Sequence, residues 1–279
     1  MSSIFKKNRT GIKVELLSSK NDYKSKSSGK QHSIIYNHEG TLFFVGAIIL
    51  WHIVSTSRIL PNSQLFPTPL IAIRTLWDSL PELGLGTWSS FLVLFPSYIL
   101  AVVSGIFTGI IVGVSPFLRR MFFPFARVVA PVPPTIYIPY AIAILPTFYL
   151  SSSFVIFIGA FWPVFINASA GAASTPLRYL DNSMILGLSY FDYLRKIVLP
   201  ASLPHIFNGM TIGLALSFIM LTVAELFGAT TGLGRFVQYY ADFADYNRMV
   251  AGIVYTGLIA LLSMELLEYL KQKLLFWNK

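Results

Sequence analysis

The stretch that decides the fold lies between two long hydrophobic runs and reads LDNSMILGLSYFDYLRKIVLPASLP, residues 180–204. It is polar for this chain and is broken by one glycine and two prolines. Thr175 and Pro176 just before it are typical of a helix start, an N-cap followed by proline at the first helical position. Gly187 can adopt the left-handed conformation that ends helices. We therefore predict a helix from Pro176 to about Leu186.

A second short helix is expected directly after the glycine. Ser189 is a good N-cap, and Asp192 follows it at the spacing of a capping box. The predicted helix runs from Tyr190 to Leu199 and stops at Pro200, because proline cannot continue a helical hydrogen-bond ladder.

The second helix would carry an apolar face made of Phe191, Leu194, Ile197 and Val198. Together the two helices would form an elbow with an exposed apolar surface. A thin loop has nothing to cover such a surface, so a soluble partner is expected there. A plain connector lying on the membrane is the alternative.

The composition around this elbow is that of a membrane protein. Of 279 residues, 54% are hydrophobic and 12% are charged, whereas soluble domains carry about 25% charged residues. A membrane-spanning helix needs about 20 mainly apolar residues. The predicted fold is all-α and polytopic, with about six spans at residues 42–57, 90–114, 128–150, 154–173, 206–227 and 250–267.

The basic residues give the expected orientation. We expect residues 1–40 to form a basic, disordered cytoplasmic tail, and residues 41–279 to form the transmembrane domain, with the elbow in loop 175–204. All but four of the 21 Lys and Arg residues then lie on the cytoplasmic side, and both termini are cytoplasmic. This placement near anionic lipid argues against a nucleic-acid partner. The four exceptions are Arg58, Arg74, Arg235 and Arg248.

Catalytic and metal-binding motifs are missing from the sequence. There is no cysteine, no phosphate-binding loop, and only four scattered histidines. Glu225 is the one acidic residue expected inside a span, whereas ion-coupled transporters bury several ionisable groups. Energy for transport would then come from another subunit. Glu225 itself would either brace the loop at 228–234 through hydrogen bonds or line an outer gate.

The second predicted span carries a row of small residues. Gly105, Gly109 and Gly113 share one helix face, which lets a second helix backbone approach closely. The row could serve packing within the chain or contact with a second copy, and the sequence leaves both open.

The third predicted span contains five prolines, which remove backbone donors and bend a helix. Irregular backbone at membrane depth has to be buried in protein or line a watery cavity. We therefore place this span centrally, with Pro134 and Pro139 as candidate pathway residues. Simple kinked packing is the alternative.

Two loops are expected on the outer side. Residues 61–87 would carry a separate amphipathic surface helix at 69–80, judged by apolar residues at helical spacing. Residues 228–248 are rich in aromatic and charged side chains, which would serve either as docking groups or as an interfacial aromatic belt.

The elbow resembles the EAA loop of ABC importer permeases, which runs Glu-Ala-Ala, three residues, Gly, nine residues and Ile-x-Leu-Pro. Here Asp181-Asn182-Ser183 stands at the first element, Gly187 at the glycine, and Ile197 to Pro200 at the end, without a gap. The first element departs from the pattern, since Asp replaces Glu and two alanines are missing.

Three further segments resemble the nitrate/sulfonate/taurine/bicarbonate branch of that family. They are FPTPLIAIRTLW at 66–77, PVPPTIYIPYAIAILPTFYL at 131–150, and AELFGATTGLGRFV at 224–237. One departure is the start of the second span, SSFLVLFPSYIL, where the branch often has an arginine and this chain has no charge.

The resemblance implies a type I ABC importer permease of the bacterial inner membrane, with no cofactor of its own. ATP and Mg would be bound by two partner ATPase subunits. The other expected partners are a second copy of the permease and an external solute-binding protein, and the solute would be a small anion of the nitrate, bicarbonate, sulfonate or taurine type. By resemblance, the ATPase-coupling residues are Asp181, Gly187, Ser189, Tyr190, Phe191, Leu194, Ile197, Leu199 and Pro200.

Two other kinds of protein compete with this interpretation. A membrane-embedded enzyme would need clustered ionisable groups near one membrane face, which the sequence does not offer. A scaffold or assembly subunit without a translocation path would keep the spans but would not need the articulated elbow.

Overall fold

Every regular element is a helix in the part of the chain that the computed structural model describes, namely residues 40–57, 65–176, 178–179, 182, 185 and 187–275. The chain divides into two units, Met1–Pro69 and Leu70–Lys279, which are described separately. The predicted all-α membrane architecture is confirmed.

The described part of the first unit is a short apolar helix, Gly40–Thr56, at the place of the first predicted span. Trp51 Nε1 and Ser55 Oγ both donate hydrogen bonds to the Pro67 carbonyl, over 3.1 and 3.3 Å. These bonds hold the segment that follows close to the helix. The predicted basic tail lies outside the described residues, apart from Gly40.

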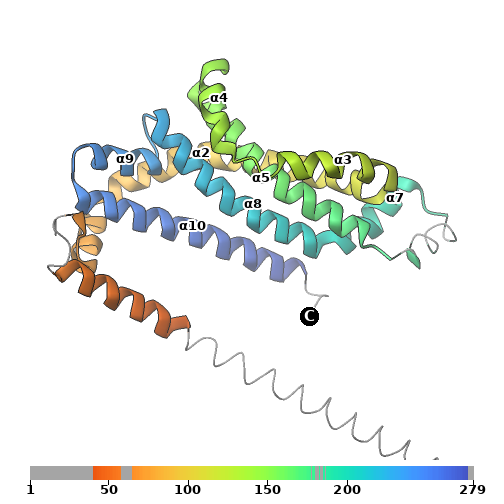
Figure 1. The fold of residues 1–279 in the computed structure, drawn as a ribbon. Coiled ribbons are helices and arrows are strands. Elements are labelled where there is room, and N and C mark those ends of the chain that lie inside the picture. The colour runs from red at the N-terminus through yellow and green to blue at the C-terminus, as the bar shows by residue number, and fades with distance from the viewer. Residues whose placement is uncertain are drawn as a thin grey trace, which may run out of the picture. The chain divides into compact units, whose positions relative to one another are not determined.

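The second unit contains the long helices (Figure 1). Four helical stretches of the described residues are long and apolar enough to cross a membrane, and a bent helix pair brings the count to five if it is one span. The predicted number of six is therefore not confirmed. The four stretches are α2 (Pro69–Val114), α5 (Phe148–Ala173), residues Tyr190–Gly228, and α10 (Tyr246–Leu274).

Helix α2 is much longer than predicted. It contains 46 residues, which at 1.5 Å per residue is about 70 Å, and it includes the predicted surface helix at 69–80. The prediction of a separate helix was wrong because Pro81 and Pro96 lie inside α2 without ending it. A buried stripe through Ala72, Ser79 and Leu83 continues along the helix past the first proline, so packing outweighs the lost hydrogen bond.

The third predicted span is not one helix. The chain forms α3 (Pro116–Val129), a turn, the 3₁₀ helix η2 (Pro134–Tyr137) and α4 (Ile138–Ile144), and the two helical parts are bent by 78°. Prolines at 131, 133 and 134 withhold three N–H groups at the bend, which explains the break. Helix α4 projects from the bundle in Figure 1, so the central position predicted for this segment is not found within the single chain.

Helices α2, α5 and α8 (Leu199–Gly228) form the core. The main cluster of buried side chains takes Leu94 and Ala101 from α2, Ile156 and Ala160 from α5, and Leu221 from α8. Tyr98 on α2 also donates a 2.8 Å hydrogen bond to the Met210 carbonyl of α8. Close three-helix packing thus defines the bundle.

The glycine row of α2 packs against α5 of the same chain. A Cβ on Gly109 would lie 2.7 Å from the Phe165 carbonyl and 2.8 Å from Ala168 Cβ, and one on Gly113 would overlap Ser169. Gly105 likewise faces α5. Of the two alternatives left open by the sequence, the structure shows the intrachain contact.

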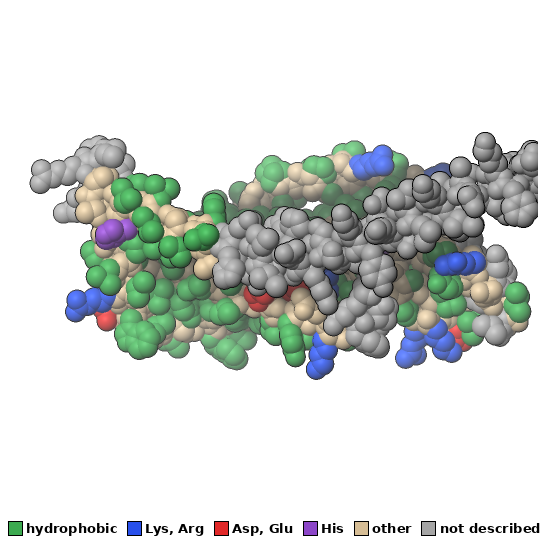
Figure 2. All heavy atoms as spheres, turned by 90° about the horizontal axis from the view of Figure 1, so that it is seen from below, with side chains coloured by type: hydrophobic (Ala, Val, Ile, Leu, Met, Phe, Trp, Pro, Cys, Tyr) green, Lys and Arg blue, Asp and Glu red, His purple; other side chains and the backbone are tan. Residues whose placement is uncertain are grey.

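The outer surface of the described residues is strongly apolar. Figure 2 shows that hydrophobic side chains predominate on the face in view and that charged ones are few. Phe107 on α2 and Leu262 on α10 are 67% and 61% exposed. Such a surface suits a bilayer rather than water.

The remaining elements lie at the two ends of α8. Before it come α7 (Tyr190–Tyr193) and the π-helix η3 (Leu194–Val198), and after it comes α9 (Leu233–Asp242), which the sequence analysis treated as a loop. Helices α7 and α9 occupy opposite ends of the bundle (Figure 1). One continuous helix, α8, therefore connects the segment of α7 and η3 at one end of the bundle with α9 at the other end.

Candidate functional sites at the two ends of α8

The tip of the elbow has the local geometry predicted from its residues. Gly187 has φ of +65°, the left-handed conformation. Ser189 caps α7, since its hydroxyl accepts the Asp192 N–H at 3.2 Å, and Asp192 in turn forms a 2.8 Å ion pair with Lys196. These exposed polar contacts shape the turn and add little stability.

The second helix of the elbow does not stop at Pro200, contrary to the prediction. The chain widens into η3, where the Leu199 N–H donates to the Leu194 carbonyl, five residues back. A proline ring clashes with the carbonyl four residues before it in an α-helix, and a widened turn relieves that clash. Pro200 then sits in the first turn of α8. The second helix of the elbow is therefore continuous with α8, from Tyr190 to Gly228, whereas most of the first predicted helix, 176–186, lies outside the described residues.

The apolar face of the elbow is more deeply packed than predicted. Tyr193 and Val198 are buried against Ile110 of α2, Ala168 of α5 and Ile206 of α8. This cluster anchors the base of the elbow in the bundle.

The other predicted coupling residues divide between this base and the tip. Leu194, Ile197 and Leu199 are half-buried against the same cluster, whereas Tyr190 and Phe191 remain 66% and 69% exposed. Within the second helix of the elbow the exposed apolar side chains are thus those of the tip, and Ile185 just before the tip is 83% exposed as well. Asp181 lies outside the described residues.

Glu225 joins three helices at the other end of α8. Its carboxylate is buried, 3% exposed, and accepts 2.6 Å hydrogen bonds from Ser90 Oγ of α2 and from the Gly234 N–H of α9. The Leu233 N–H donates to the same Ser90 hydroxyl at 2.9 Å. The first turn of α9 is therefore capped by side chains of α2 and α8.

The glycines of the 224–237 motif make room for this carboxylate. Gly232 has φ of +137°, and a Cβ there would overlap the Glu225 carboxylate. A Cβ on Gly234 would lie 2.6 Å from the Thr222 carbonyl. The spacing of glutamate and glycines thus follows from the close approach of α8 and α9. These contacts are the hydrogen bonds expected if Glu225 braces the loop.

Ser90 was missed by the sequence analysis. It stands 135 positions from Glu225, and a serine at the start of an apolar run carries no local signal of a distant partner. Ser89 beside it makes a 2.7 Å hydroxyl contact with Thr231. Two successive serines of α2 therefore hold the loop before α9.

A second polar chain links α2, α9 and the start of α10. Tyr240 donates a 2.9 Å hydrogen bond to Glu82 Oε2, and Arg248 Nη1 donates to the Tyr240 hydroxyl at 3.2 Å. Burial raises the pKa of the Tyr240 phenol, and the hydrogen bond to Glu82 raises that pKa further. Tyr240 therefore stays a neutral donor that fixes the Glu82 carboxylate.

The two candidate pathway prolines lie in different surroundings. Pro134 lines a hollow of about 250 Å³ between η2, α5 and α8, together with Trp162 and Asn167. Pro139 is exposed on α4 and does not line that hollow. Among the described residues, no three potential metal ligands come together.

Comparison with known proteins places these features in a family. Residues 101–276 match the model of the binding-protein-dependent transport system inner membrane component, which covers more than half of the chain. The chain belongs to this family of ABC importer permeases. The matched range includes the elbow and the Glu225 motif.

Several named relatives support the same branch. The permease is 32% identical to the nitrate import permease protein of Leptolyngbya laminosa over 63% of each chain. It is 29% identical to the bicarbonate transport system permease protein of Synechocystis sp., over 82% of this chain and 85% of the relative. It is 34% identical to the taurine transport system permease protein of Escherichia coli, over 64% of this chain and 65% of the relative. The matches thus span just under two thirds of the nitrate and taurine relatives.

Membership in this family makes the chain a multi-pass transport component of the inner membrane rather than an ATPase itself. The predicted resemblance to the nitrate, bicarbonate and taurine branch is confirmed.

Proposed function

We propose that this permease forms the membrane path of an ATP-driven importer for a small anionic solute, as the names of its relatives suggest. The energy would come from two separate ATPase subunits that bind ATP and Mg. A solute-binding protein would deliver the solute at the α9 end, and a second copy of the permease would complete the path.

The observation that carries this proposal is the exposed tip at residues 187–191 on a base that is continuous with α8. Tyr190 and Phe191 offer apolar surface for an ATPase groove. Because the base is buried against α2 and α5, a force on the tip would move the bundle rather than bend a loop. Rocking of helices around a central path would then alternate access.

Site-directed cross-linking tests the docking. The natural chain has no cysteine, so a single introduced thiol can carry a photo-activated cross-linker. We expect Phe191→Cys to cross-link to the co-expressed ATPase. Phe107→Cys, equally exposed on the apolar flank of α2, serves as the control and should not. Cross-linking from Phe107 but not from Phe191 would contradict the proposal.

Uptake into proteoliposomes separates a permease from a scaffold. A complex of permease, ATPase and binding protein should accumulate the solute inside the vesicles. Accumulation should require ATP inside the vesicles and binding protein in the medium outside them. A scaffold subunit would co-purify with the ATPase, yet its removal would leave uptake by the remaining subunits intact.

The roles of individual pathway residues belong to the same proposal. Pro134 borders the hollow between α5 and α8 and is a candidate for the path. Pro139, exposed on α4, would meet the path only through the second copy. For Glu225 the hydrogen bonds favour the brace over the gate, because both carboxylate oxygens are already engaged.

A further inference from the structure

Helix α3 carries arginines on one side and apolar side chains on the other. Arg120 and Arg127 are seven residues apart, which places them on one face of the helix, and both are exposed. On the opposite face, Leu118, Phe122 and Phe125 line an apolar hollow of about 370 Å³ that α3 forms with α2 and α5. The two sides of α3 therefore suit different surroundings.

Arg127 lies deep in the bundle, although the span predicted at 128–150 begins only after it. The ring of Phe125, two residues earlier, is 6.2 Å from the ring of Trp162, and Trp162 is near the middle of the 26-residue helix α5. A helix of that length extends about 39 Å, whereas the hydrocarbon core of a bilayer is about 30 Å thick. Arg127 is thus level with the interior of the membrane and not with its surface.

Neither arginine has an acidic partner. The chain contains no Asp or Glu between Glu82 and Asp181, so α3, α4 and α5 carry no negative charge. Neither arginine takes part in the ion pairs found among the described residues. A charged side chain at membrane depth is costly against lipid, so it almost always faces protein or a water-filled cavity. The arginine side of α3 therefore requires water or a polar ligand.

Polar side chains continue from this side of α3 across α5 and α8. Ala130, at the end of α3, lines the hollow of about 250 Å³ described above, together with Asn167 of α5. A Cβ on Gly209 of α8 would lie 2.8 Å from Asn167 Cβ, and the neighbouring Asn208 is exposed. Trp162 lines both hollows, so it lies at the boundary between the apolar side and the side that carries Asn167.

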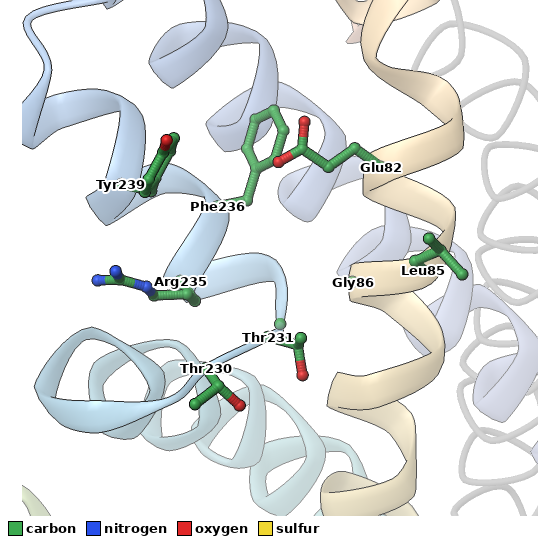
Figure 3. Close-up of a pocket in the computed structure, with 9 residues that line it drawn as sticks. Glu82, Leu85, Gly86, Thr230, Thr231, Arg235, Phe236 and Tyr239 are labelled. Atoms are coloured by element: carbon green, nitrogen blue, oxygen red, sulfur yellow. The ribbon is translucent and has the colours of Figure 1, made fainter.

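The hollow between α2 and α9, at the far end of the bundle from the elbow, differs in charge. Figure 3 shows Glu82 on α2 and Arg235 on α9 among the residues that line it, so an acid and a base both contribute there. The arginines of α3 have no such counterpart. Selection of a solute by its charge is therefore expected in the interior of the bundle.

We propose that Arg120 and Arg127 line the translocation path between mid-depth and the elbow, and that they draw anions into it. The proposal rests on the transport function proposed above, in which a second copy of the permease closes the open side of the path. Two-fold symmetry would then place two arginines from each copy around it. Rings of arginine or lysine select anions in this way, because they attract negative charge and repel cations.

The reaction of introduced thiols tests the path without knowledge of the solute. The complex of permease and ATPase is placed in nanodiscs, where reagents reach both membrane faces, and labelling is measured on the separated permease chain, which has no natural cysteine. The two probes are methanethiosulfonates, one with a sulfonate group and one with a trimethylammonium group. Each rate is divided by the rate of the same reagent with 2-mercaptoethanol.

We expect Ala130→Cys and Asn167→Cys to react with both probes, with a relative rate about tenfold higher for the sulfonate, because the arginines attract one reagent and repel the other. Phe125→Cys, on the opposite side of α3, serves as the control for position. It should react with neither probe, yet react with a lipid-soluble maleimide.

Arginine variants identify the source of the preference. Arg127→Gln should lower the rate ratio of the two probes about threefold or more, and Arg127→Lys should preserve it, because lysine keeps the charge. The double variant Arg120→Gln with Arg127→Gln should abolish the preference. Arg195→Gln, which removes an exposed arginine of η3, is the matched control and should leave the ratio unchanged.

Three outcomes would overturn the proposal: no reaction of either thiol in the hollow with the water-soluble probes, equal relative rates of the two probes while both arginines are present, or the same loss of preference in the Arg195 variant. The first outcome would place the arginine side of α3 away from water. None of the three would affect cross-linking of the tip to the ATPase. A failure of the arginine-lined path is therefore distinguishable from a failure of the transport function.

Discussion

Gly187 owes its role to backbone conformation alone. Its φ of +65° is in the left-handed region, and a Cβ added there would meet no atom within 4 Å. Any effect of a side chain at this position therefore comes from the dihedral angle and not from crowding in the chain itself.

We expect Gly187→Val to distort the elbow and to uncouple ATP hydrolysis from uptake. A β-branched residue in the left-handed region costs at least about 1–2 kcal/mol, which favours other turn geometries. The measurement is uptake per ATP hydrolysed in the reconstituted complex, together with the yield of assembled complex.

Gly187→Asn provides the matched control, because asparagine tolerates the left-handed conformation. It should retain most of the coupling. Normal coupling in the valine variant, or equal losses in both variants, would show that the conformation of residue 187 is not what matters.

Glu225 and Ser90 act as one hydrogen-bonded unit. We expect Glu225→Gln to destabilise the permease by about 1–3 kcal/mol, since an amide group cannot accept from both donors. Ser90→Ala should have a similar effect, because it leaves the Leu233 N–H and a buried carboxylate oxygen without their partner. Thermal unfolding of the purified permease measures both, with the exposed Glu265→Gln on α10 as a control.

Uptake measurements on the Glu225→Gln variant distinguish a bracing role of Glu225 from a role in an outer gate. If Glu225 only braces α9, uptake by Glu225→Gln should fall no more than the amount of folded complex. A loss of uptake at full complex yield would assign it to the gate instead, while full activity would remove that role.

At the scale of the elements, the α2–α5 contact depends on glycine. We expect Gly109→Ala to lower stability by about 1–3 kcal/mol, because its Cβ would lie 2.8 Å from Ala168 Cβ in a packed interface. The unfolding midpoint of the purified permease checks this.

Gly84→Ala on the same helix is the matched control. A Cβ at Gly84 meets nothing within 4 Å, so alanine there should stabilise α2 by about 0.5–1 kcal/mol through its helix propensity. Opposite signs for the two substitutions would support the packing argument. Equal destabilisation would contradict it.

Two element boundaries show why local rules were insufficient. A surface helix was expected over residues 69–80 and the elbow was expected to end at Pro200, yet Pro81 and Pro200 both lie within continuous helical stretches. Proline removes one donor and creates one steric clash. Burial along α2 and the widened turn of η3 compensate for these local costs, and neither compensation is visible in the sequence pattern.

At the scale of the whole molecule, α8 links the elbow to α9. Its first turns share a buried cluster with Tyr193 and Val198, and its last turn carries Glu225, which holds α9. A displacement at the elbow is therefore expected to reach the opposite end of the bundle through one packed helix.

Hydrogen exchange of the assembled complex tests this link. Adding the ATPase should slow amide exchange at residues 187–193 by direct cover. Closing the ATPase with a non-hydrolysable nucleotide should change exchange at 229–236 as well. A response restricted to 187–193 would contradict transmission through α8, and the exposed middle of α10 serves as the internal reference.

The sequence by itself determined the class of the protein: an apolar, all-helical chain, a left-handed glycine, a serine cap, and motifs whose spacing identifies the family. These features are local, since backbone conformation and hydropathy are set by a few neighbouring residues. Only the tertiary structure decided which helices are continuous, that the glycine row meets α5, and that Ser90 reaches Glu225. Those outcomes depend on packing between residues far apart in the chain, where burial outweighs local preference.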